Sequence, residues 1–156
     1  MVQQITARPG QKADLLGPED ILQLHVTGNT LVNDGDVVVR NTDGQGVSAV
    51  AGAENTKFAV VLRYSLGKSG KNADGSEAYQ AKDIAPIMAI GRIWVKTTTP
   101  VTDITAAVYV KTANGTTEAP LGSLSASSVD GTAFPNASWE TTTNAEGLAI
   151  LRLRGA

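Results

Sequence analysis

His25 is the residue of this chain best suited to acid–base or metal chemistry, because it is the sole histidine and the chain has no cysteine. A catalytic histidine needs a nucleophile and an orienting acid beside it, and a metal-bound histidine needs further ligands. Without cysteine there are no thiolate ligands, thiol nucleophiles or disulfides. The alternation of residues 21–26 places His25 on the face of Gln23 and opposite Leu24. We therefore expect it on the polar face of a strand.

The tripeptide Gly67-Lys68-Ser69 matches the end of a phosphate-binding loop. The complete motif needs a glycine five residues before Gly67, where this chain has Leu62, and a helix after the serine. The residues that follow, 70–75, instead form a glycine-rich turn sequence. The sequence therefore predicts no nucleotide site and no cofactor.

Asp34-Gly35-Asp36 could open a calcium loop, which needs another oxygen ligand two residues later and a glutamate at position twelve. Val38 occupies the first of these places, and the next glutamate is Glu54. A hairpin turn explains the tripeptide better. Most acidic residues lie beside turn glycines or in polar loops, so we expect no metal site and no catalytic residue, and we interpret the protein as a non-enzyme.

The two tryptophans, Trp94 and Trp139, could form a sugar-stacking platform. Each lies in an apolar or β-forming context, and the chain has only seven aromatic residues. Packing in a core or in an interface is therefore the favoured interpretation of both.

The composition is that of a protein with few charges. The 156 residues correspond to one domain, and the net charge is −2 with 13 basic residues scattered singly, which argues against a nucleic-acid partner. No apolar run reaches the length of a membrane helix or of a signal peptide, so we expect no membrane partner and synthesis in the cytoplasm. Charged residues make up 18% of the chain, against about 25% in ordinary domains, which favours permanent packing against other proteins.

Turn dipeptides divide the chain into short β-branched runs. Asp-Gly or Asn-Gly occurs at 34–35, 43–44, 74–75, 114–115 and 130–131, and these pairs suit tight hairpin turns. Strands are predicted at 21–26, 36–40, 46–51, 57–64, 86–96, 107–111, 138–142 and 148–154. The pattern predicts an all-β fold, either an antiparallel β-sandwich or jelly roll, or a small β-barrel.

Residues 148–154 show the clearest alternation, with Leu151 and Leu153 predicted inward and Arg152 and Arg154 outward. The best helical candidate is a single turn at 17–22, and less than a tenth of the chain should be helix. Residues 66–78 are predicted to be an irregular loop.

The N-terminal residues are polar and are predicted to form an extended arm. We assign residues 1–20 to this arm and residues 21–156 to a single β domain. Residues 1–16 have little apolar surface, so we expect them to be ordered only through contact with a neighbouring subunit or another protein.

The order of these segments resembles the cement, or capsid decoration, proteins of tailed bacteriophages. The segments that carry the resemblance are 33–39, 47–51, 58–64, 89–95, 107–112, 137–141 and 147–154. It implies a structural virion protein on the outer capsid surface, with the major capsid protein as partner and a homodimer or homotrimer as the unit. Two alternatives stay open at this point, a phage tail, fibre or baseplate module and a carbohydrate-binding β domain.

Our hypothesis for the contact surface combines the arm with outward side chains of two strands. Its members are Gln3, Gln4, Ile5, Thr6, Arg8, Trp94, Arg152 and Arg154.

Overall fold

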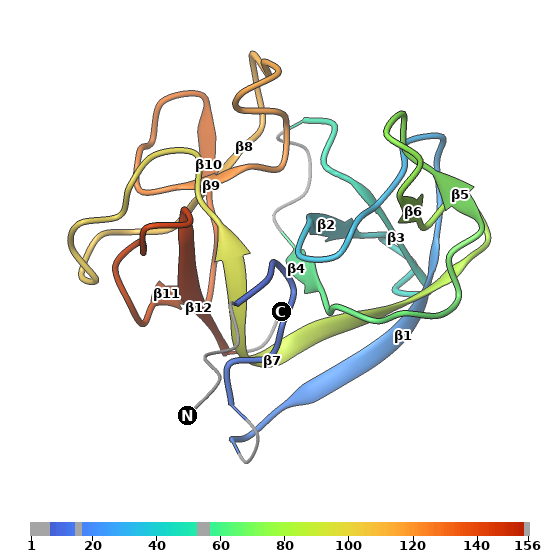
Figure 1. Cartoon of the computed structure of the whole chain (residues 1–156), viewed down its shortest axis with the longest axis horizontal. Helices are drawn as coiled ribbons and strands as arrows, with labels where there is room; N and C mark the ends of the chain where they lie inside the picture. The colour runs from blue at the N-terminus through green and yellow to red at the C-terminus, as the bar shows by residue number, and fades with distance from the viewer. Residues whose placement is uncertain (1–6, 15–16, 53–56, 155–156) are drawn as a thin grey trace, which may run out of the picture.

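The computed structural model describes residues 7–14, 17–52 and 57–154 (Figure 1). In these ranges the protein consists of strands and loops, and no helix is present. The all-β prediction is therefore confirmed. The strands are β1 Asp20–Val26, β2 Val37–Arg40, β3 Gly46–Ala49, β4 Phe58–Val61, β5 Gly70–Lys71, β6 Glu77–Ala78, β7 Ile84–Lys96, β8 Tyr109–Lys111, β9 Leu124–Ser125, β10 Gly131–Ala133, β11 Ala137–Trp139 and β12 Leu148–Arg154.

Five strands close into a small barrel in the order β1-β3-β2-β4-β7, and β7 also pairs with β1. All of these pairs are antiparallel except β1 with β3, where His25 lies opposite Gly46 and Val26 opposite Val47. The prediction of an antiparallel sheet is wrong for this one pair, whose parallel contact closes the barrel. Side chains from all five strands fill the interior: Val26, Val38, Val47, Ala59, Val61, Ala85 and Ile87, joined by Val32 and Tyr79.

The second region is a sandwich built on the far half of β7. This half pairs with β12, and β12 pairs with β11. The separate sheet β10-β8-β9 packs over them, and Figure 1 shows this region and the barrel on opposite sides of the molecule, connected by β7. The apolar side chains between the layers include Phe58, Val60, Met88, Ile93, Val95, Val108, Val110, Leu124, Phe134, Trp139, Leu151 and Leu153.

A bulge in β7 connects the two cores. In the pairing of β7 with β1, Ile90 lies opposite Asp20 and Met88 lies opposite Ile21, so Ala89 has no partner on β1. A bulge of one residue reverses which face each later side chain occupies. Met88 and Ile93 can consequently both face the sandwich core, although they are an odd number of positions apart in the sequence. Gly91 follows the bulge with φ +138°, a conformation that favours glycine.

The predicted strands all coincide with observed ones, with small shifts at their ends, but four short strands were not predicted. The loop predicted at 66–78 contains the hairpin β5–β6, and β9 and β10 were also missed. The single helical turn predicted at 17–22 is wrong, because β1 begins at Asp20 and pairs with β7 there. Backbone pairing with a long neighbouring strand outweighs the weak local preference of Pro18 for a helix start.

Residues 10–13 of the predicted arm lie along β7 within the same chain. Gly10 N donates to Trp94 O at 2.8 Å, Trp94 N to Gln11 O at 2.8 Å, and Ala13 N to Arg92 O at 2.9 Å. The expectation that residues 1–16 are ordered only by contact with another protein is therefore wrong for this segment. The physical reason is that β4 pairs with β7 only at Val60–Met88 and Val61–Ile87, so β4 does not cover the edge of β7 at residues 92–94 and the segment can pair there.

Candidate interface on the outer sheet face

The sandwich sheet has one face buried against the core and one face directed away from it. We call this second face the outer sheet face. The pairing of neighbouring strands arranges the side chains of this face in three rows. The first row contains Trp94, Ile150 and Glu140, the second contains Arg92, Arg152 and Ser138, and the third contains Ile90 and Arg154. The intervening residues Ile93, Val95, Leu151, Leu153 and Trp139 are buried in the core. Strict alternation on paired strands therefore fixes which side chains reach the surface.

The charges on this face are partly paired. Arg92 Nη1 lies 2.9 Å from Asp14 Oδ2, and the Glu140 carboxylate lies 3.8 Å from Arg92 Nε and 3.4 Å from Arg152 Nη1. Arg154 is exposed, and its side chain has no acidic neighbour within ion-pair distance in the described part of the chain. Arg92 and Arg152 therefore share the two carboxylates, and Arg154 pairs with neither.

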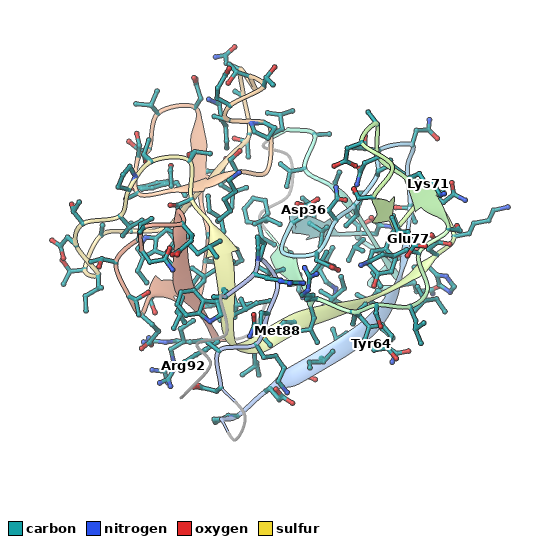
Figure 2. All side chains as sticks on the ribbon, viewed as in Figure 1. Asp36, Tyr64, Lys71, Glu77, Met88 and Arg92 are labelled. Atoms are coloured by element: carbon teal, nitrogen blue, oxygen red, sulfur yellow. The ribbon has the colours of Figure 1, made fainter. Side chains whose placement is uncertain are left out.

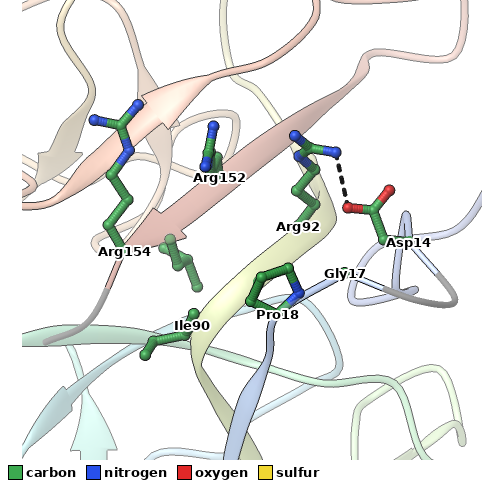
Figure 3. A pocket seen from close by; sticks show the side chains of 9 residues that line it. Asp14, Gly17, Pro18, Ile90, Arg92, Arg152 and Arg154 are labelled. Carbon is green, nitrogen blue, oxygen red and sulfur yellow. Dashed lines mark hydrogen bonds and ion pairs between the residues drawn. The ribbon is translucent and has the colours of Figure 1, made fainter.

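A pocket of about 290 Å³ opens between this face and the residues before β1 (Figure 3). Arg92 projects from β7 and Arg152 and Arg154 from β12, while Asp14, Gly17 and Pro18 form the opposite wall. Ile90, Gly91 and Leu153 complete the lining. The lining thus combines three arginines with the apolar residues Pro18, Ile90 and Leu153.

Comparison with protein families decides what class of protein carries this surface. A family model described as structural cement protein (E217 gp24/Pam3 gp6) matches residues 2–154. The chain belongs to this family of structural cement proteins.

The fold of this cement protein also occurs in a solved structure. A chain in the structure described as the capsid of Myoviridae phage XM1 superimposes with a TM-score of 0.71 and 16% identity, over 99% of this chain and 94% of that one. At this identity the likeness establishes the shared fold. No curated protein sequence matches the chain.

The structure brings together three members of the predicted contact surface of the cement protein. Trp94, Arg152 and Arg154 lie on the outer sheet face, with Trp94 half-buried. Arg8 is exposed and lies two residues before Gly10, which pairs with β7. Gln3, Gln4, Ile5 and Thr6 lie outside the described residues.

Sequence reasoning missed Arg92, Asp14 and Glu140. A signal for Arg92 was available, because it lies two residues from Trp94 in a predicted strand and therefore on the same face. Asp14 could not be found this way, since its position depends on pairing of the N-terminal segment with β7, which is not periodic in the sequence.

In the cement protein, the candidate catalytic or ligand-binding residues His25, Lys68 and Ser69 contact other residues of the fold. His25 is exposed on β1, and its Nδ1 lies 3.5 Å from Lys82 O. The Lys68 ammonium lies 2.9 Å from Asp34 Oδ2 and 5.4 Å from the centre of the Tyr79 ring. Ser69 Oγ donates to Asp83 Oδ1 at 2.7 Å. These bonds fix the loop around Lys68 against the barrel.

Within residues 7–14, 17–52 and 57–154, no three His, Asp or Glu side chains come together as a set that could hold a metal ion. No helix long and apolar enough to cross a membrane occurs in the same ranges.

Proposed function

We propose that this cement protein binds the outer surface of the assembled phage capsid and contacts the major capsid protein through the outer sheet face. The observation that carries the proposal is the family match over residues 2–154. Its action is non-enzymatic, because stabilisation by binding needs no chemical step.

The outer sheet face has the properties of a protein-binding surface. Trp and Arg are enriched among the residues that dominate binding energy, and here Trp94 and three arginines lie on adjacent rows. The side chains project from paired strands, so the backbone that carries them loses little conformational freedom when a partner covers them. Ile150 and Ile90 supply apolar area between the charges.

Binding to the assembled lattice stabilises that lattice by mass action. A ligand that binds only the assembled state shifts the equilibrium by about 2.7 kcal/mol per site at a hundredfold excess over Kd. If the cement protein acts as a homodimer or homotrimer, one unit spans several capsid subunits and the effect multiplies through multivalency. Sedimentation equilibrium of the purified protein tests this part, and a monomer at all concentrations would reject it.

The test of the cement role compares heads with and without the protein. DNA-filled heads are stripped of the cement protein and heated beside untreated heads, while DNA release is followed with an intercalating dye. Stripped heads should release DNA at a lower temperature, and addition of purified protein should restore the original value. Equal release temperatures in all three samples would contradict the proposed function.

A further inference from the structure

We infer that the three-arginine pocket is a receptor for a carboxylate side chain, Glu or Asp, presented by the capsid protein and bound between Arg152 and Arg154. This inference rests on the proposed function and names the chemistry by which the outer sheet face recognises its partner.

The arginines of this pocket have too few acidic partners within the part of the chain that the structure describes. Arg92 and Arg152 are directly opposite each other on paired strands, and like charges in that position repel. Arg154 lies on the same face two residues further along β12. Asp14 and Glu140 neutralise two of the three positive charges, so one positive charge remains uncompensated at the pocket. A carboxylate from another protein would complete the set.

The geometry of the pocket also suits a carboxylate. The contact of Arg92 Nη1 with Asp14 Oδ2 at 2.9 Å occurs in the pocket wall and shows that a carboxylate fits against an arginine of this pocket (Figure 3). Arg152 has a single long contact with Glu140 at 3.4 Å, and 44% of its side chain is exposed. Both Arg152 and Arg154 thus keep guanidinium N–H groups available for the forked hydrogen bonds that carboxylates accept.

The surroundings of the arginines favour a carboxylate over a nucleic-acid phosphate. A phosphate chain needs a continuous basic track, but Asp14 and Glu140 flank the arginines on both sides. The pocket volume of about 290 Å³ is at the lower limit for small-ligand sites, about 300–1,000 Å³, which suits one inserted side chain.

NMR of the free protein tests the inference without the capsid. Hexaglutamate is titrated at low salt into isotope-labelled protein, and the arginine Nε–Hε signals are followed. Signals of Arg152 and Arg154 should shift, and the Arg154→Gln variant should lose the response. The matched control is Lys71→Gln, which removes an exposed positive charge on β5 at the far side of the molecule from Arg92 (Figure 2). Absent shifts, loss of the response in the control, or equal shifts with an oligothymidylate would each overturn the inference.

Binding to stripped heads gives a second, independent measurement. The Arg154→Glu variant should bind about tenfold more weakly than the wild type, as expected when a charged hydrogen-bonded pair is lost, and raised salt should narrow the difference. Lys71→Glu should bind like the wild type. Equal binding of both variants would overturn the inference and leave the cement role intact, whereas a wild-type protein that fails to bind heads would reject the proposed function itself.

Discussion

The barrel and the sandwich are held together by different interactions. Each of the five barrel strands has hydrogen-bonded neighbours on both sides, and the interior side chains are mostly Val and Ala, with Ile87 and Tyr79 as the largest. The sheet β10-β8-β9 has strands of two or three residues, and it meets the rest of the sandwich mainly through side chains. The backbone ladder therefore organises the barrel, whereas side-chain packing holds the β10-β8-β9 layer on the rest of the sandwich.

Large aromatic side chains contribute to the packing that holds the sandwich together. Phe58, Phe134 and Trp139 are all buried in the sandwich core, and the rings of Phe58 and Phe134 lie 5.4 Å apart. The same core supports the strands that present the outer sheet face. Loss of one large side chain should consequently loosen the sandwich before the barrel, because ladders of short strands provide little cooperative backbone bonding.

The largest effect is expected for Phe134→Ala, which should lower the free energy of unfolding by about 4 kcal/mol through lost burial and a cavity. Hydrogen exchange should show amides of β8, β9 and β10 losing protection while amides of β2 and β4 keep more of theirs. Uniform loss of protection across the chain would show that the two regions unfold as one unit.

A somewhat smaller effect, about 3 kcal/mol, is expected for Ile87→Ala in the barrel interior. Ile87 is fully buried, and β7 runs through both regions. Here protection should fall in the barrel and in the sandwich together. Selective loss of protection in the barrel, with the sandwich unaffected, would contradict the view that the sandwich depends on the barrel through β7.

The contact of the N-terminal segment with the barrel should be sensitive to a single methyl group. Gly10 has φ +80°, and an added Cβ would lie 2.6 Å from Gly35 N. Gly10→Ala should therefore lower the free energy of unfolding by about 2 kcal/mol. The matched control is Gly28→Ala, because Gly28 has the same φ and open space around it. This variant should lower the free energy of unfolding by about 1 kcal/mol. Equal urea-unfolding free energies for both variants would mean that the close approach of Gly10 to Gly35 has no energetic weight.

The smallest effect is expected at the barrel residue Tyr79, and it depends on pH. Burial, followed by the nearby charge of Asp34, raises the pKa of the Tyr79 phenol from 10.0 to about 12. Between these values the unfolded chain releases the phenolic proton and the folded chain retains it, so stability should fall as pH rises above 10. Tyr79→Phe should change stability little at neutral pH and should reduce the alkaline decline, measured by urea unfolding across the pH range. An unchanged decline would contradict the raised pKa.

Sequence periodicity was sufficient for the strands that alternate strictly. Leu151 and Leu153 are buried and Arg154 is exposed as predicted, and Val110 on β8 and Val108 just before it are both buried. In β4, however, residues 58–61 are all buried, because Phe58 and Val60 face the sandwich while Ala59 and Val61 face the barrel. Alternation cannot show that both faces are covered, since that depends on which elements pack there.

The candidate site was predictable in part for the same reason. Trp94, Arg152 and Arg154 share one face because β7 and β12 pair in a register that brings outward residues into rows. The pocket also requires Asp14, which reaches Arg92 across 78 residues of sequence. Long-range pairing of a short, non-alternating segment leaves no periodic signal, and the bulge at Ala89 is likewise determined by the partner strand.

The orientation of the protein on the capsid tests the account most directly. A cryo-EM map of decorated heads should show the outer sheet face against the major capsid protein, with Trp94 covered and a capsid Glu or Asp between Arg152 and Arg154. The barrel hairpin β5–β6 should then lie away from the capsid contact. A map in which the outer sheet face is exposed to solvent, and the capsid contacts another surface, would contradict the proposed interface.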